Sequence, residues 1–206
     1  MVQGKDGIIR AICVYLGSHD GSDPDFVEAA KLFGAILAQN GIRLVYGGTA
    51  RGLMGELARS VLAYGGEVTG ITTDDFLKSE GAPLGVNMIV APHIHDRKFL
   101  MFKQADAFVA FPGGVGTLEE LVEQLTWAQI GRHRKPVLLA NIKRFWDPLL
   151  ILLDHMRGLK FIHSDHEVTA LVANRVEDIL PILKGEVETL DSVSDAEGDT
   201  ATLSKL

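Results

Sequence analysis

Cysteine is almost absent from the 206-residue sequence, because Cys13 is the only one and lies inside an apolar run. A single cysteine excludes an internal disulfide, so we expect Cys13 to be a small core residue in a chain suited to a reducing compartment. No apolar run approaches the roughly 20 residues that span a membrane, and the N-terminus lacks the apolar core of a signal peptide. These absences predict a cytoplasmic protein with no membrane partner.

The sequence also has no excess of basic residues. The chain has 20 Lys and Arg against 27 Asp and Glu, which gives a formal net charge of −7. This balance argues against a large positive surface for nucleic acid. With 47% hydrophobic and 23% charged residues, the composition is that of a globular protein of one ordinary domain.

Two common nucleotide-binding fingerprints are missing. No Gly-x-Gly-x-x-Gly follows the first predicted strand, so a dinucleotide-dependent dehydrogenase is not favoured. The Walker pattern Gly-x4-Gly-Lys-[Ser/Thr] is absent too, which removes support for nucleoside triphosphate hydrolysis by that loop. A phosphate site is therefore sought in other glycine-rich segments.

Apolar runs alternate with helix-like segments along most of the chain. Strands are expected at residues 8–16, 42–46, 67–71, 86–90, 106–111, 137–140 and 168–172. Helices are expected at 24–40, about 52–64, within 72–85, 99–103, 121–130, 148–156 and 176–184. This alternation predicts βαβ units and a parallel sheet, in a single α/β domain over residues 1–185. Residues 186–206 are polar and acidic without periodicity, which predicts a disordered or loosely attached tail.

Three of the predicted strands run into loops that contain glycine. These loops begin at Gly17-Ser18, at Gly47-Gly48 and at Pro112-Gly113-Gly114. Because the carboxyl ends of parallel strands meet at one edge of a sheet, the three loops should converge there, where ligands of such sheets bind. Glycine lets backbone N–H groups approach a ligand closely, and a helix N-terminus adds partial positive charge. The convergence predicts an anion site, most often a phosphate site.

The third loop belongs to the stretch around which the chain is organised, residues 106–130. A buried strand leads into Pro112-Gly113-Gly114-Val115-Gly116-Thr117, and an amphipathic helix is expected from residue 121. Glu120 then falls in the first turn, beside whatever the phosphate carries. The structural alternative is a tight turn followed by a capping box, in which Thr117 is the N-cap and Glu120 occupies the third helical position.

This motif, with the residues around it, carries a resemblance to a known family. Pro112-Gly113-Gly114-x-Gly116-Thr117-x-x-Glu120, Arg97-Lys98 and the downstream Thr126-Trp127-Ala128-Gln129 resemble the LONELY GUY family. Its members are cytokinin riboside 5′-monophosphate phosphoribohydrolases, often labelled lysine-decarboxylase-like. The resemblance covers roughly residues 12–172, and two motif parts at matching separation make it specific.

The resemblance implies a Rossmann-like three-layer sandwich with a mainly parallel sheet, usually in a homodimer. It implies hydrolysis of the N-glycosidic bond of a purine or cytokinin nucleoside 5′-monophosphate, giving free base and ribose 5-phosphate. We expect no cofactor and no metal. Arg97 and Glu120 carry over as catalytic residues. The expected substrate-binding residues are Gly17, Ser18, Gly47, Gly48, Met54, Lys98, Gly113, Gly114, Val115, Gly116, Thr117 and Glu119.

The chain departs from the family pattern at two places. The second loop usually reads Gly-Gly-Gly, whereas here Thr49 stands third. If that position needs a positive φ, threonine would be strained there; otherwise the loop differs or Thr49 contributes its hydroxyl. The usual Met-His-Glu-Arg-Lys is Ile94-His95-Asp96-Arg97-Lys98, so neighbours of Arg97 have changed. Both changes leave open whether the base is a cytokinin or plain adenine.

Other interpretations are weighed against this one. A carrier of a phosphorylated cofactor such as molybdenum cofactor would share the fold and glycine loops, and the retention of both Arg97 and Glu120 favours the enzyme. A lysine decarboxylase is rejected, because no lysine lies in a pyridoxal phosphate context. His93-x-His95 and His163-x-x-His166 lack a third ligand at metal-site spacing. The helix at 121–130, with Trp127, is interpreted as a packing or dimer-forming face.

Overall fold

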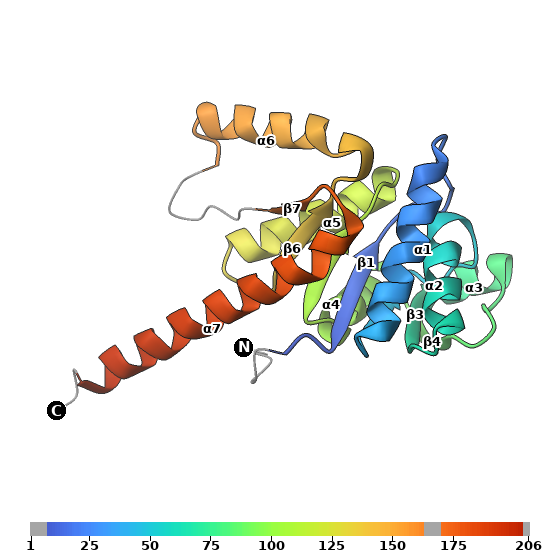
Figure 1. The fold of residues 1–206 in the computed structure, drawn as a ribbon, viewed down its shortest axis with the longest axis horizontal. Coiled ribbons are helices and arrows are strands. Elements are labelled where there is room, and N and C mark those ends of the chain that lie inside the picture. Colours follow the sequence, from blue (N-terminus) through green and yellow to red (C-terminus); the bar gives the residue numbers. More distant parts are fainter. Residues whose placement is uncertain (1–7, 163–169, 204–206) are drawn as a thin grey trace.

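The computed structural model describes residues 8–162 and 170–203, which form one α/β unit with a single sheet (Figure 1). The strands are β1 (Ala11–Tyr15), β2 (Arg43–Tyr46), β3 (Val68–Thr73), β4 (Asn87–Ala91), β5 (Ala107–Ala110), β6 (Val137–Ala140) and β7 (Leu171–Ala173). The α-helices are α1 (Pro24–Gln39), α2 (Gly52–Ala63), α3 (Asp74–Glu80), α4 (Ile94–Gln104), α5 (Val115–Gln129), α6 (Asp147–Gly158) and α7 (Ile179–Leu203). Two 3₁₀ turns, η1 (Ile142–Arg144) and η3 (Val176–Asp178), precede the last two helices.

The strands described pair in parallel throughout, in the order β4-β3-β2-β1-β5-β6-β7. From β1 the chain first builds outward through β2 to β4 and then returns to the other side of β1 with β5. The order therefore reverses between β1 and β5, and a sheet of this kind binds its ligands beyond the carboxyl ends of the strands at that reversal. The expected mainly parallel, Rossmann-like sandwich is confirmed.

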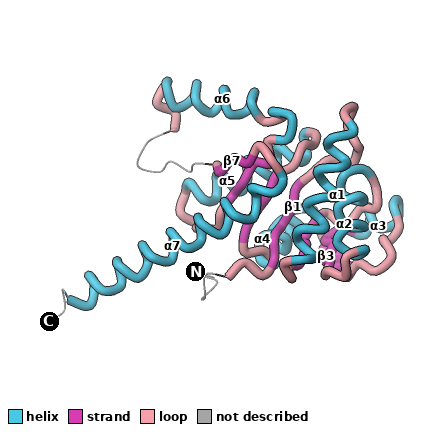
Figure 2. The backbone as a smooth tube through the Cα atoms, in the orientation of Figure 1, coloured by secondary structure: helices cyan, strands magenta, loops and turns pink. Residues whose placement is uncertain are grey.

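Alternate residues of the strands face two apolar layers. Along β1, Ile12 and Val14 pack with α1, α2 and α7, whereas Ala11, Cys13 and Tyr15 pack with α4, α5 and the start of α6. Every residue of β1 is buried, as expected for a strand covered on both faces. Figure 2 shows the strands lying between the two sets of helices. Cys13 is fully buried within the second layer, as expected for a core residue.

Most element boundaries lie within a few residues of expectation, and helix starts explain the larger differences. At α1 the Asp23 side chain accepts a hydrogen bond from the Asp25 N–H, and Pro24 fits the first turn, as the sequence indicates. By contrast, α5 begins at Val115, six residues before the expected start, with Gly114 as its N-cap. Gly116 lies inside this first turn. Because glycine has a low helix propensity, the sequence indicated a loop there.

The end of the chain also differs from expectation. The helix expected at 176–184 is a 3₁₀ turn followed by α7, which continues through Gly185 to Leu203. Val187 packs against the core beside Leu183, so contacts with the domain extend past residue 185. Whether residues 186–206 can be removed without loss of stability stays a prediction. The expected strand at 168–172 begins partly outside the described residues, and β7 spans Leu171–Ala173.

Among the helices of residues 8–162 and 170–203, none is both long and apolar enough to cross a bilayer.

We predict that the crossing of α1 and α2 requires Gly34. A Cβ at Gly34 would lie 2.6 Å from the Ser60 Cβ and 2.8 Å from the Leu57 carbonyl oxygen. Gly34→Ala should therefore lower the free energy of unfolding by roughly 1–2 kcal/mol, because overpacking outweighs the helix propensity gained. Gly158→Ala, where a Cβ meets nothing within 4 Å, is the matched control and should be neutral or stabilising. Equal chemical-denaturation midpoints for the two variants would contradict this account.

Candidate functional site

Backbone hydrogen bonds join the loops after β1 and β5 and the start of α2, which follows the second glycine loop, at the carboxyl edge of the sheet. The Gly17 N–H donates to the Pro112 carbonyl at 3.1 Å, and the Met54 N–H donates to the Gly17 carbonyl at 3.2 Å. The loop after β1 thus lies between the loop after β5 and the start of α2. The convergence expected from the sequence is present, at the reversal of strand order between β1 and β5.

Two of these glycines leave room for a neighbouring functional side chain. A Cβ at Gly113 would lie 2.2 Å from the Thr117 Oγ1, and a Cβ at Gly47 would lie 2.5 Å from the Arg97 Nη2. A Cβ at Gly113 would displace the Thr117 side chain, and a Cβ at Gly47 would displace the Arg97 side chain. The close approach explains why glycine stands at these positions, independently of any ligand.

The N-terminus of α5 is exposed and lacks a capping side chain. Its N-cap is Gly114, whose neighbours Val115 and Gly116 are also exposed. A Cβ at Gly114 or Gly116 would meet nothing within 4 Å, so the approach to this helix end is open. The first N–H groups of a helix carry partial positive charge and bind anions well. The geometry therefore suits a phosphate at the start of α5.

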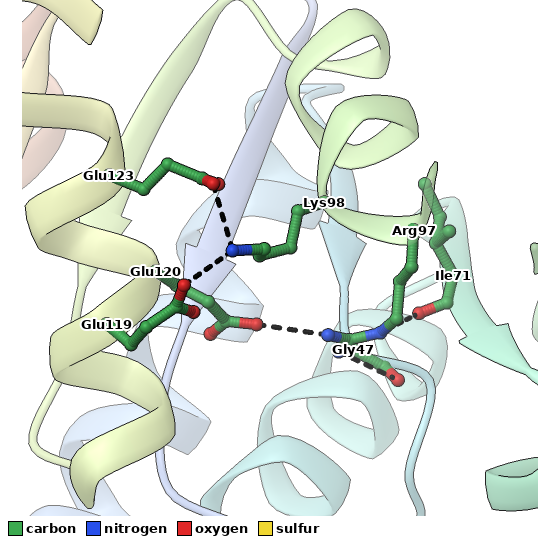
Figure 3. Close-up of polar contacts among 7 residues, drawn as sticks. All are labelled: Gly47, Ile71, Arg97, Lys98, Glu119, Glu120 and Glu123. Atoms are coloured by element: carbon green, nitrogen blue, oxygen red, sulfur yellow. Dashed lines mark hydrogen bonds and ion pairs between the residues drawn. The ribbon is translucent and has the colours of Figure 1, made fainter. Parts of the chain in front are cut away.

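Arg97 connects three elements of the site. From α4, its Nε donates to the Ile71 carbonyl of β3 at 2.8 Å, and its Nη2 lies 3.4 Å from the Gly47 carbonyl. Its Nη1 donates to the Glu120 Oε1 of α5 at 3.1 Å (Figure 3). Both side chains are largely buried, with 11% of Arg97 and 15% of Glu120 exposed. Charged hydrogen bonds to fixed backbone groups hold this guanidinium in one orientation.

Glu120 is a buried carboxylate rather than a helix cap. Because α5 starts at Val115, Glu120 occupies its sixth position, in the second turn, and Thr117 lies inside the helix. The capping box with Glu120 at the third position is therefore wrong. Burial raises the pKa of Glu120, while the charge of Arg97 and its hydrogen bond oppose that rise. A carboxylate in this setting is poorly solvated, which strengthens its field on a nearby charge.

Lys98 lies beside this pair and bonds two other carboxylates of α5. Its Nζ lies 2.5 Å from the Glu119 Oε1 and 2.9 Å from the Glu123 Oε1. Burial opposes the charge of Lys98, but the hydrogen bonds to the two glutamates outweigh it, so its pKa is raised. Glu123 was not singled out from the sequence. Its spacing of four from Glu119 places both on one helix face, which was the available signal.

The backbone of the second loop shows whether Thr49 is strained. The positive φ, +82°, belongs to Gly48, and Thr49 is not among the residues with positive φ. The Thr49 Oγ1 instead accepts a hydrogen bond from the Arg51 N–H at 3.2 Å, and the side chain is buried. Threonine is thus unstrained here and contributes its hydroxyl to the loop. Ser18 is exposed, with its Oγ 3.4 Å from the His19 Nδ1.

Trp127 packs inside its own chain. Its ring meets Phe102 of α4 edge-on at 5.2 Å between centroids, and the Arg132 guanidinium lies 4.3 Å above it. Leu121 is fully buried, whereas Ile130 is 69% exposed. The helix face named from the sequence is therefore divided between internal packing and solvent.

A metal site would need at least three ligand side chains close together. Within the described ranges, no three His, Cys, Asp or Glu side chains come together as metal ligands would. His93 and His95 are exposed at the start of α4. His163 and His166 lie outside the described residues.

Comparison with known sequences adds to this geometry. A family model described as "Possible lysine decarboxylase" matches residues 54–183. A probable cytokinin riboside 5′-monophosphate phosphoribohydrolase of Oryza sativa subsp. japonica is 43% identical over 181 residues, covering 87% of this chain and 81% of the relative. A cytokinin riboside 5′-monophosphate phosphoribohydrolase of Rhodococcoides fascians is 36% identical over 177 residues, covering 85% and 89%.

Solved structures support the fold. A molybdenum cofactor carrier protein from Chlamydomonas reinhardtii superposes with a TM-score of 0.65 at 21% identity, covering 87% of this chain and 98% of that one. A molybdenum cofactor binding protein from Rippkaea orientalis gives 0.62 at 21% identity, covering 85% and 95%. At this identity the likeness concerns the fold alone. The sequence relatives are much closer, and by them the chain belongs to the LONELY GUY family of cytokinin riboside 5′-monophosphate phosphoribohydrolases, within the wider family described as possible lysine decarboxylases.

Proposed function

We propose that the protein hydrolyses the N-glycosidic bond of a purine or cytokinin nucleoside 5′-monophosphate, releasing free base and ribose 5-phosphate. The observation that carries this proposal is the buried Arg97–Glu120 pair beside the open N-terminus of α5. The curated relatives named above, of which this chain spans more than four fifths, bear the name of this activity.

Hydrolysis of the N-glycosidic bond is favoured by a negative charge next to the sugar. Water adds its oxygen to C1′ as the C1′–N9 bond breaks, and the electron pair of that bond leaves with the purine. One water proton ends on the base and the other on the new C1′ hydroxyl. The transition state carries positive charge on the ribose, which the Glu120 carboxylate would stabilise while it orients or deprotonates the water.

The substrate phosphate is assigned to the N-terminus of α5. The exposed turn at Gly114, Val115 and Gly116 offers N–H groups to an anion, and Lys98 supplies a nearby charge. Gly113 and Thr117 shape this turn through their close contact. Gly17, Ser18, Gly47, Gly48 and Met54 complete the proposed set of substrate contacts, together with the backbone of Glu119. They lie in the glycine loops after β1 and β2 and in the first turn of α2, and Glu119 lies in α5.

Arg97 has two roles that its position allows. Its guanidinium holds Glu120 and fixes the orientation of the carboxylate. The second proposed role is a contact with the ribose, the phosphate or the departing base. In either role its charge favours the ionised form of Glu120, on which the reaction depends.

Two alternatives concern the ligand rather than the fold. An AMP nucleosidase without cytokinin preference would use the same residues, so a panel of nucleoside monophosphates decides between the bases. A carrier of molybdenum cofactor is suggested by the structural neighbours, whose identity with this chain is 21%. A carrier has no need of a buried carboxylate held by arginine, and the Arg97–Glu120 pair therefore favours the enzyme.

We further propose a cytoplasmic homodimer. Cys13 is buried and free, as suits a reducing compartment. No residue of α6 is fully buried, and several apolar side chains on α5, on α6 and directly after each of these helices are exposed. They are Val122, Ile130, Ile151, Leu152, Met156 and Leu159. A contact with a second copy of the chain, which the family resemblance implies, would cover these apolar side chains.

The substrate prediction compares AMP with adenosine. Binding energy from the phosphate at α5 should be used to reach the transition state, so adenosine should have a far lower kcat/KM than AMP. Released base is measured by chromatography over a panel that includes a prenylated adenosine monophosphate. Equal kcat/KM for AMP and adenosine would remove the phosphate site from the proposal.

The catalytic prediction concerns Glu120→Gln. Glutamine keeps the size of the side chain and can still accept from Arg97, but it cannot offer a full negative charge to the ribose. The value of kcat should fall roughly 10²–10³-fold, with the affinity for nucleotide little changed. Glu177→Gln, which alters an exposed pair with Arg175, is the matched control and should retain full activity. A folded Glu120→Gln protein with near-normal turnover would refute the assignment.

The assembly prediction concerns the mass of the protein in solution. Light scattering at micromolar concentration should give twice the chain mass of 22.3 kDa. Ile151→Glu should shift the protein toward the monomer, because it places a charge among exposed apolar groups of α6. Leu84→Glu, at a 95% exposed position before β4, is the control and should not change the mass. A monomeric wild-type protein would overturn the dimer.

A further inference from the structure

Lys98 is an almost buried cation shared by two carboxylates. Only 9% of its side chain is exposed, and its ammonium contacts Glu119 and Glu123, one helical turn apart on α5 (Figure 3). Arg97 and Glu120 form a one-to-one pair beside it. Taken together, Arg97 and Lys98 carry two positive charges and the three glutamates three negative ones. The cluster thus holds one carboxylate more than its cations require, at the place assigned to an anionic substrate.

The two carboxylates that hold Lys98 differ in their surroundings. The Glu119 side chain is 54% exposed, so water can solvate it if it leaves the lysine. The Glu123 side chain is 21% exposed, and its Oε2 is buried without a hydrogen-bond partner among the described residues. Glu123 therefore relies on Lys98, because separating the two would leave a poorly solvated carboxylate alone.

We propose, on the basis of the function argued above, that Glu123 is a positioning residue which anchors Lys98 while the anionic group of the substrate displaces Glu119. A lysine ammonium has three N–H donors, and the two glutamates engage two of them. When Glu119 turns into solvent, the Lys98 N–H group that donated to Glu119 becomes available to the nucleotide. The bond to Glu123 keeps the long, flexible lysine stem directed at the site throughout.

This arrangement gives the two glutamates opposite effects on affinity. Removal of either negative charge would, by Coulomb attraction alone, strengthen the binding of an anion. If Glu123 acts by holding Lys98, its neutralisation instead frees the lysine and weakens binding. Glu119 competes with the substrate for the same ammonium, so its neutralisation strengthens binding. Loss of one negative charge beside Lys98 is thereby predicted to weaken binding at Glu123 and to strengthen it at Glu119.

The test measures the Kd of ribose 5-phosphate, the proposed product, by calorimetry, together with KM and kcat for AMP. Glu123→Gln should raise Kd and KM by about tenfold, on the scale of one charged hydrogen bond, and leave kcat within about threefold. Glu119→Gln should lower both constants several-fold. In a Lys98→Met background, Glu123→Gln should have no further effect, since the group it positions is gone.

The outcomes separate this inference from the proposed function. A fall in Kd for both glutamine variants, or an unchanged effect of Glu123→Gln in the Lys98→Met background, would overturn the anchoring role. Unfolding midpoints measured on every variant show whether a weakened affinity reflects lost structure, and an affinity loss in a protein that melts at the wild-type temperature supports the inference. If wild-type protein binds ribose 5-phosphate but releases no base from AMP, the proposed function fails, while the contrast in Kd still decides the role of Glu123.

Discussion

The ion pair between Arg97 and Glu120 is the interaction on which the rest of the site depends. Arg97 reaches Gly47 after β2, Ile71 in β3 and Glu120 in α5, so it ties the two halves of the sheet together at their carboxyl edge. The pKa of Glu120 is raised by burial, which means that its ionisation lowers the stability of the folded state as pH rises from the ordinary carboxyl range through that raised value. Arg97 limits this loss. Arg97 thus shifts the protonation equilibrium of this buried group toward the carboxylate.

Much of the fold could be predicted from the sequence, because its signals are local. Fully apolar runs such as that of β1 indicate buried parallel strands, and Asp23-Pro24 marks the start of α1. The errors arose where local preference and packing disagree. Gly114 and Gly116 suggested a loop, yet α5 begins at Val115. Gly185 and the polar residues after it suggested an end, yet α7 continues and Val187 still reaches the core.

The site was predictable to the extent that topology determines it. Three glycine loops after three parallel strands had to meet at one edge, and Gly17, Met54 and Pro112 are joined there by hydrogen bonds. The pairing of side chains between different elements could not be predicted from the sequence, because it depends on how α4 and α5 pack. The contact of Lys98 with Glu123 and the space that Gly47 leaves for Arg97 follow only from that packing. The roles of these residues in binding and catalysis stay predictions.

Titration of the Glu120 carboxyl shows directly whether Arg97 favours its ionised form. The pKa of Glu120 can be followed by ¹³C NMR of glutamate-labelled protein, with Glu120→Gln to assign the resonance. We expect a pKa above the ordinary glutamate value in the wild-type protein and a higher one in Arg97→Met, since burial remains and the opposing charge is lost. Lys98→Met should raise it less, because Lys98 opposes the rise less than Arg97 does. A Glu120 carboxyl that titrates at the same pH with and without Arg97 would show that Arg97 does not stabilise its ionised form.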